Sequence, residues 1–184
     1  MNINAENLAE KLISKALGIK GYTEIITTLH SRNLSTDKDY QRLYNSFFVV
    51  RRNEAWRTIY YDFFEKNKGR QDITFEEILY YLFEKTGQIE HSFSSKMLAT
   101  IKPNMPIWDV YILNHVGFEL QGKTKQEQLK NRVQIYNQII AWYDEFLLTS
   151  EATACIEKFD QLMPSYRWIT PIKKIDYIIW GIRE

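Results

Sequence analysis

The chain has few of the residues that cross-link small folds or interrupt helices. It contains one cysteine, Cys155, so no disulfide can form within the chain, and we expect a reducing, cytoplasmic compartment. Only seven glycines and four prolines occur among 184 residues, which is few for a turn-rich β fold. These scarcities favour a fold built from long helices.

An excess of one charge and long apolar runs are also missing. The 24 basic and 23 acidic residues leave a formal net charge of +1. Proteins that coat nucleic acid without sequence preference usually carry more positive charge, so contact with a polyanion must come from a local patch. No apolar run is long enough to cross a bilayer, and the N-terminal residues read as an amphipathic helix rather than a signal sequence. We therefore expect no membrane partner.

Apolar residues, which make up 45% of the chain, recur at helical spacing along most of its length. Strand-like patterns are confined to residues 47–50 and 166–169, which are too short to build a sheet. We therefore predict one all-α domain, 1–184, with nine or ten helices. Two helical halves, about 1–70 with the C-terminal helices and about 71–120, are expected around a cleft.

Capping residues predict where several helices begin and end. Asn53 and Thr74 precede periodic segments, and Thr124 with Glu127 has the spacing of a capping box. Glycine, here at Gly18 among other positions, is expected to end helices. The predicted helices span 4–17, 22–30, 37–48, 54–68, 75–86, 92–102, 107–116, 125–147, 151–162 and 171–182, with Ser35 or Thr36 capping the third and Ser150 the ninth.

The segment from Lys85 to Gly117 carries polar residues within an otherwise apolar context. Lys96 stands among apolar residues, so partial burial of its amine is expected. A lysine relieved of its charge can attack an electrophilic sugar carbon, and a carboxylate such as Asp109 can position it or stabilise cationic charge. The alternative is that Lys96 is a solvated residue on an amphipathic helix and that Asp109 caps or pairs nearby.

The order of elements in this segment resembles that of the helix-hairpin-helix DNA glycosylases. A helix is followed by a glycine turn, a second helix opening with lysine, and a proline-containing loop that leads to aspartate. The run SSKMLATIKPNMPIWDVYIL is similar to the branch that includes 8-oxoguanine glycosylases. The resemblance covers mainly residues 86–116 and implies a degenerate helix-hairpin-helix near residues 75–102, with Lys96 as nucleophile and Asp109 assisting.

A basic cluster with an aromatic residue in its midst lies further upstream. Arg51, Arg52, Asn53 and Arg57 surround Trp56 at a predicted helix start. Guanidinium groups and free backbone amides there can hold phosphate, and an aromatic ring can stack on a base. The alternative is that Trp56 packs in the core while the arginines pair with nearby acids.

Together these residues predict a DNA glycosylase or abasic-site lyase that extrudes a nucleotide into a pocket. Ser94 and Ser95 join the arginines as nucleic-acid contacts, and Trp56, Phe93 and Trp108 are the expected pocket walls. Two other hypotheses stay open. One is a noncatalytic relative that kept the scaffold and binds DNA or protein, and the other is an unrelated helical module whose aromatic surface docks a protein.

Metal and cofactor chemistry is not expected. The three histidines are scattered, and none has a second ligand at helical spacing. The iron–sulfur cluster of some glycosylase branches needs four cysteines, whereas this chain has one. Cys155 lies within an amphipathic pattern and is predicted to be a small core residue.

Overall fold

The computed structural model describes residues 16–109, 113, 117 and 119–182. This part of the chain holds eight α-helices, one short 3₁₀ helix and no strand, which confirms the all-α prediction with slightly fewer helices than expected. The predicted helices 4–17 and 107–116 lie mostly outside the described residues. The elements are α2 (Ala16–Thr28), α3 (Lys38–Phe48), α4 (Glu54–Asn67), α5 (Phe75–Thr86), α6 (His91–Ile101), α8 (Lys125–Leu147), α9 (Ser150–Leu162), η1 (Pro164–Tyr166) and α10 (Pro171–Ile182).

Several helix boundaries follow the predicted capping residues. The Asn53 Oδ1 atom accepts a hydrogen bond from the Trp56 amide at 2.9 Å at the start of α4. Thr124 and Glu127 form the reciprocal capping box at the start of α8. Gly87 ends α5 with φ of 69°, a left-handed conformation that glycine adopts without steric cost. These local signals were sufficient because each cap involves residues close in sequence.

Other boundaries were predicted wrongly. Helix α2 continues through Gly18, where a stop was expected, because its buried face packs against the rest of the fold and the Tyr177 hydroxyl donates to the Gly18 carbonyl at 3.2 Å. Tertiary contacts here outweigh the low helix propensity of glycine. Asp37, rather than Ser35 or Thr36, caps α3, and Thr149 caps α9.

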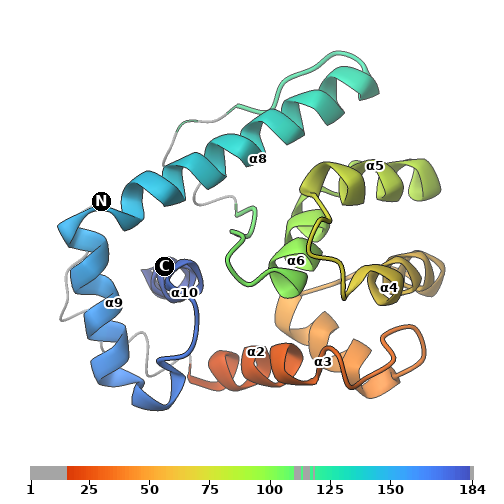
Figure 1. Ribbon diagram of the computed structural model, residues 1–184. Helices are drawn as coiled ribbons and strands as arrows, with labels where there is room; N and C mark the ends of the chain where they lie inside the picture. The colour runs from red at the N-terminus through yellow and green to blue at the C-terminus, as the bar shows by residue number, and fades with distance from the viewer. Residues whose placement is uncertain (1–15, 110–112, 114–116, 118, 183–184) are drawn as a thin grey trace.

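The helices are arranged around a central pair (Figure 1). Helices α5 and α6 form a hairpin joined by residues 87–90, and α4 packs beside α5. The long α8 crosses α5 and leads to α9, and α10 packs against both α8 and α9. Helices α2 and α3 pack against each other at the bottom of the view. Among the described residues, no helix is long and apolar enough to cross a lipid bilayer.

An aromatic cluster joins α3, α4 and α6 in the core. The Tyr44 and Tyr60 hydroxyls lie 2.8 Å apart, and the Tyr60 hydroxyl reaches the Phe93 carbonyl at 3.1 Å. The Tyr61 hydroxyl donates to Asn45 Oδ1 at 2.7 Å. Burial raises the pKa of all three tyrosines well above the ordinary value, so the hydroxyls stay neutral. This cluster fixes the start of α4 relative to α6, where the predicted site residues lie.

Candidate functional site

Lys96 lies on α6 and is half-buried. Its amine donates a hydrogen bond to the Phe48 carbonyl at 3.0 Å and lies 4.9 Å from the centroid of the Phe93 ring. Phe48 is the last residue of α3, where helix carbonyls carry partial negative charge. Lys96 therefore links α6 to the C-terminal end of α3.

Asp109 follows a loop that returns to α6. The Trp108 amide donates a hydrogen bond to Ser95 Oγ at 2.9 Å, so the peptide before Asp109 lies against the helical turn that carries Lys96. The structure thereby brings together two segments that sequence analysis paired. The roles of the Lys96 amine and the Asp109 carboxylate in catalysis remain predictions.

Ser94 and Ser95 are fully buried. The Ser94 hydroxyl donates to the Glu90 carbonyl at 2.8 Å, and the Ser95 hydroxyl donates to the Ser92 carbonyl at 2.9 Å. Both hydroxyls are therefore used inside the protein, and this geometry gives no support to their predicted contact with nucleic acid. Their burial depends on the returning Trp108 loop, which helical periodicity does not reveal.

Arg52 is held by a partner far away in sequence. Its guanidinium forms a 2.9 Å ion pair with the buried Glu90 carboxylate, which stands just before α6. The same guanidinium lies 5.3 Å from the centroid of Phe93 and 5.8 Å from that of Trp56. Glu90 was missed in the sequence because its partner, Arg52, stands 38 positions away along the chain. Its carboxylate lies in the connection between α5 and α6.

Of the three predicted pocket residues, Trp56 and Trp108 lie in the core, and the half-buried Phe93 packs against it. Trp56 is 6% exposed and its ring stacks on Tyr60 with 4.9 Å between centroids, while Phe93 packs against it at 5.0 Å. Trp108 packs against His91 at 4.6 Å. None of the three lines the groove between α3 and α4 or either of two cavities beside α8. The alternative reading of Trp56 as a core residue is confirmed.

Polar atoms without partners gather around the start of α6. Trp56 Nε1, Glu90 Oε1, His91 Nδ1 and Trp108 Nε1 are buried and make no hydrogen bond among the described residues. Burial, assisted by the positive charge of Arg132, lowers the pKa of His91 to about 4. Its imidazole is therefore neutral near pH 7. His91 was not singled out in the sequence because no neighbouring residue indicated its burial.

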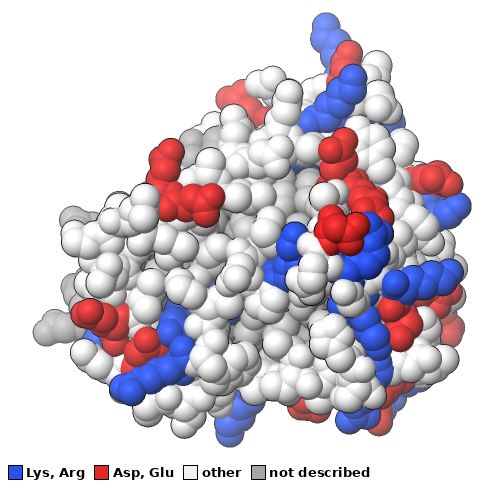
Figure 2. Space-filling view, viewed as in Figure 1, with Lys and Arg blue, Asp and Glu red and all other residues white. Residues whose placement is uncertain are grey.

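A basic groove opens between α3 and α4. This α3–α4 groove has a volume of about 240 Å³ and is lined by Ser35, Lys38, Gln41, Arg42, Asn45, Glu54, Arg57 and Thr58. Three side chains are cationic and one is acidic. Of the predicted phosphate contacts, Arg57 lies here, whereas Arg51 is exposed before α4 and Asn53 caps that helix. The face in Figure 2 mixes both signs of charge with broad uncharged areas, so positive charge on that face is local.

Hydrogen-bond donors dominate the α3–α4 groove. Asn45 Oδ1 is occupied by the Tyr61 hydroxyl, which leaves the Asn45 amide hydrogens available. Gln41 Oε1 accepts from the Lys38 amine at 3.3 Å, and the Arg57 guanidinium has no ion pair with any described residue. Within the described part of the chain, Arg42 pairs only with the exposed Asp39. An oxyanion, which accepts hydrogen bonds and carries negative charge, fits this lining.

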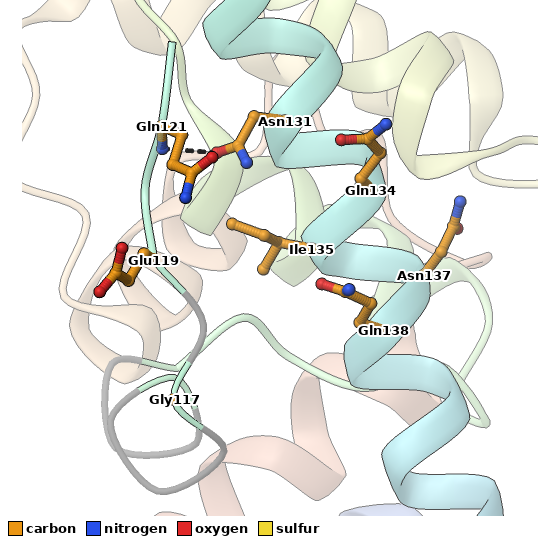
Figure 3. A pocket seen from close by; sticks show the side chains of 8 residues that line it. All are labelled: Gly117, Glu119, Gln121, Asn131, Gln134, Ile135, Asn137 and Gln138. Atoms are coloured by element: carbon orange, nitrogen blue, oxygen red, sulfur yellow. Dashed lines mark hydrogen bonds between the residues drawn. The ribbon is translucent and has the colours of Figure 1, made fainter.

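A larger cavity lies beside α8, and Glu119 is the charged residue in its described lining (Figure 3). It has a volume of about 700 Å³ and is lined by Gly117, Glu119, Gln121, Asn131, Gln134, Ile135, Asn137 and Gln138. The Gln121 amide donates to Asn131 Oδ1 at 2.9 Å, which holds the extended segment against the helix. Ile135 and Gln138 point toward that segment, whereas Glu119 points away. The described residues of its lining include no lysine or arginine, so they do not favour a phosphate.

Metal ligands and reactive thiols do not gather in the described residues. Within these ranges, no three His, Cys, Asp or Glu side chains lie close enough to hold a metal ion. Cys155 is buried in the core, as predicted, and burial raises the pKa of its thiol.

Comparison of the chain with protein-family models, with curated proteins and with solved structures gives no match. The resemblance to helix-hairpin-helix glycosylases therefore stays a prediction based on residues 86–116. Functional inference must come from the geometry of this chain alone.

Proposed function

We propose that this protein is a noncatalytic nucleic-acid-binding module that contacts backbone phosphates through the α3–α4 groove. The observation that supports this is the convergence of Lys38, Arg42 and Arg57, from two helices, on one cavity of about 240 Å³. Guanidinium groups present paired donors that match phosphate oxygens, and lysine adds a compact positive charge. Glu54 is the single acidic residue in the lining, so the groove keeps a positive balance.

The surroundings favour a polymer over an isolated phosphate. Arg51 is a further exposed cation, two residues before the Asn53 cap of the helix that carries Arg57. A cavity of this size admits a phosphate group but not a whole nucleotide with its base. Several weak contacts along a backbone can then supply affinity that one phosphate does not.

The test is fluorescence anisotropy with labelled single-stranded and duplex oligonucleotides across a range of salt concentrations. We expect affinity to fall steeply with salt, with a slope of about −0.7 to −0.9 per phosphate contacted. Arg57→Met should reduce the magnitude of that slope by about 1. Lys130→Met, which removes an exposed lysine of α8 outside the groove, is the matched control. The proposal would be overturned by an affinity that does not change with salt, or by equal losses of affinity in Arg57→Met and Lys130→Met.

A lysine-dependent glycosylase or lyase is the second candidate. The hydrogen bond from the Trp108 amide to Ser95 Oγ supports it, because it brings the segments of Lys96 and Asp109 together. In that reaction the Lys96 amine bonds to the sugar carbon and loses a proton, while the bond from that carbon to the base breaks. The base leaves with the electron pair and takes up the proton. Asp109 would stabilise the cationic charge on the sugar.

Borohydride trapping separates the two candidates. The protein is incubated with oligonucleotides that carry abasic, 8-oxoguanine or uracil sites, and the reduced adduct is detected on a gel. A covalent band lost in Lys96→Ala but kept in Lys102→Ala, a matched lysine just after α6, would establish the lyase. Salt-dependent binding without a band on any substrate would support the noncatalytic module.

A further inference from the structure

A second small cavity lies where α8 crosses the beginning of α5 and the end of α6. This α5–α6–α8 cavity has a volume of about 270 Å³ and is lined by Ile73, Thr74, Phe75, Glu76, Leu98, Lys102, Met105, Val133, Tyr136, Asn137 and Ile140. Sequence analysis gave no indication of it, because its walls come from three helices and a loop. The residues that line it are different from those that line the α3–α4 groove.

Most of the α5–α6–α8 cavity wall is apolar. Phe75, Leu98 and Tyr136 are almost completely buried. The Tyr136 ring stacks on Phe75 with 4.0 Å between centroids and 17° between planes. Its hydroxyl donates to the Pro106 carbonyl at 2.8 Å, so Tyr136 presents its ring to the cavity and not an available hydroxyl. The wall is therefore suited to a ring or a branched aliphatic group.

Lys102 is the partly buried charged residue at this cavity. In the described part of the chain its amine makes no hydrogen bond or ion pair. The nearby acid Asp72 is paired instead with Arg70 at 2.8 Å. Glu76 and Asn137 lie at the exposed rim, and the Thr74 hydroxyl is used as a cap for the Glu77 amide.

The cavity volume limits the size of a ligand. A dry cavity of about 150 Å³ accommodates benzene, so about 270 Å³ admits one ring with a short side chain. We propose that the α5–α6–α8 cavity binds a small organic acid with an aromatic or branched apolar body and one carboxylate. The body packs among Phe75, Leu98 and Val133, and the carboxylate pairs with Lys102. This site goes beyond the proposed phosphate contacts and does not depend on them.

The first test compares three probes of one shape and different charge. Phenylacetate, phenylacetamide and phenethylamine are titrated into the full-length protein, and amide shifts are followed by two-dimensional NMR. We expect shifts centred on the lining residues, with phenylacetate tightest and phenethylamine weakest. Equal affinities for the three probes, or no shift up to millimolar concentration, would overturn the proposal.

The second test uses variants of the lining. Lys102→Met should weaken the binding of phenylacetate by about threefold to fivefold and leave the affinity for phenylacetamide unchanged. The effect is modest because a partly exposed charge pair contributes little to the binding free energy. Lys130 is an exposed residue of α8 that does not line the cavity, so Lys130→Met should change neither affinity. Val133→Trp places a larger side chain at a half-buried position of the lining, fills the cavity, and should abolish the binding of phenylacetate and of phenylacetamide. If Lys102→Met has no effect on phenylacetate, the assignment of the carboxylate to Lys102 fails, whatever the fate of Val133→Trp.

Discussion

Two ion pairs that each contain a buried carboxylate differ in how completely the carboxylate oxygens are satisfied. On α10, Lys173 and Asp176 are 2% and 3% exposed and pair at 2.8 Å. The Tyr143 hydroxyl donates to the other oxygen of Asp176, so both carboxylate oxygens are used. At the start of α6, Glu90 pairs with Arg52 through one oxygen, and its second oxygen is buried without a hydrogen bond among the described residues.

The Lys173–Asp176 pair therefore has both carboxylate oxygens satisfied, whereas the start of α6 contains buried polar atoms without hydrogen bonds among the described residues. A buried polar atom without a partner costs about 1–3 kcal/mol, and such groups in native proteins require an explanation. Near Glu90, the Trp56 Nε1 and His91 Nδ1 atoms are likewise buried without a hydrogen bond among the described residues. We therefore expect removal of the Asp176 carboxylate to lower the free energy of unfolding more than removal of the Glu90 carboxylate does.

The largest effect is expected from Asp176→Ala. It leaves Lys173 buried without its carboxylate, and removing one partner of a buried pair typically destabilises by about 3–5 kcal/mol. Urea unfolding measures this change in free energy. The double variant Lys173→Met with Asp176→Leu should recover most of the loss, since apolar residues can replace such a pair. A loss below 1 kcal/mol for Asp176→Ala would contradict the comparison.

Acid should destabilise the protein through His91. Its pKa is about 4 when folded and about 6.5 when unfolded, so the unfolded chain binds the proton more readily. The contribution of neutral His91 is complete above pH 6.5 and is lost as the pH falls toward 4, by about 2–3 kcal/mol. Unfolding free energies measured from pH 7 to 4 should decline less in His91→Phe. The exposed His30→Phe variant should behave like the unchanged protein.

Glu90→Ala should have a smaller effect than Asp176→Ala. Arg52 is 37% exposed in its side chain and can turn to water when the carboxylate is removed, and the unpaired oxygen disappears as well. We expect a loss of about 1 kcal/mol in urea unfolding. A loss as large as that of Asp176→Ala would show that the two pairs are equivalent and remove the distinction.

The smallest effect is a gain in stability from Val49→Gly. Val49 caps the C-terminal end of α3 with φ of 55°, a left-handed conformation that disfavours a β-branched residue, and the residue is 56% exposed. Relief of that strain exceeds the entropy cost of glycine, so we expect a gain of about 0.5–1 kcal/mol in thermal unfolding. Val50→Gly, at a buried position, should destabilise instead.

The predicted basic cluster shows how far sequence reasoning reached. Arg57 was predicted to hold phosphate and lines the α3–α4 groove, but Lys38 and Arg42 were not predicted, because only the packing of α3 on α4 brings them together. Arg52 was expected to contact nucleic acid or a nearby acid, yet it pairs with Glu90, 38 positions away and just before α6. Proximity along the chain identified candidates without identifying their partners.

The sequence alone determined the all-α class and the helix ends at Asn53, Gly87 and Thr124. Apolar periodicity and capping depend on residues within a few positions of one another, so they act before the helices pack. Only the tertiary structure decided that Ser95 is buried beneath the Trp108 loop and that Lys102 borders a cavity. Burial, pairing and cavity shape depend on side chains brought together from distant segments, and the free energy of those contacts arises only when the helices assemble.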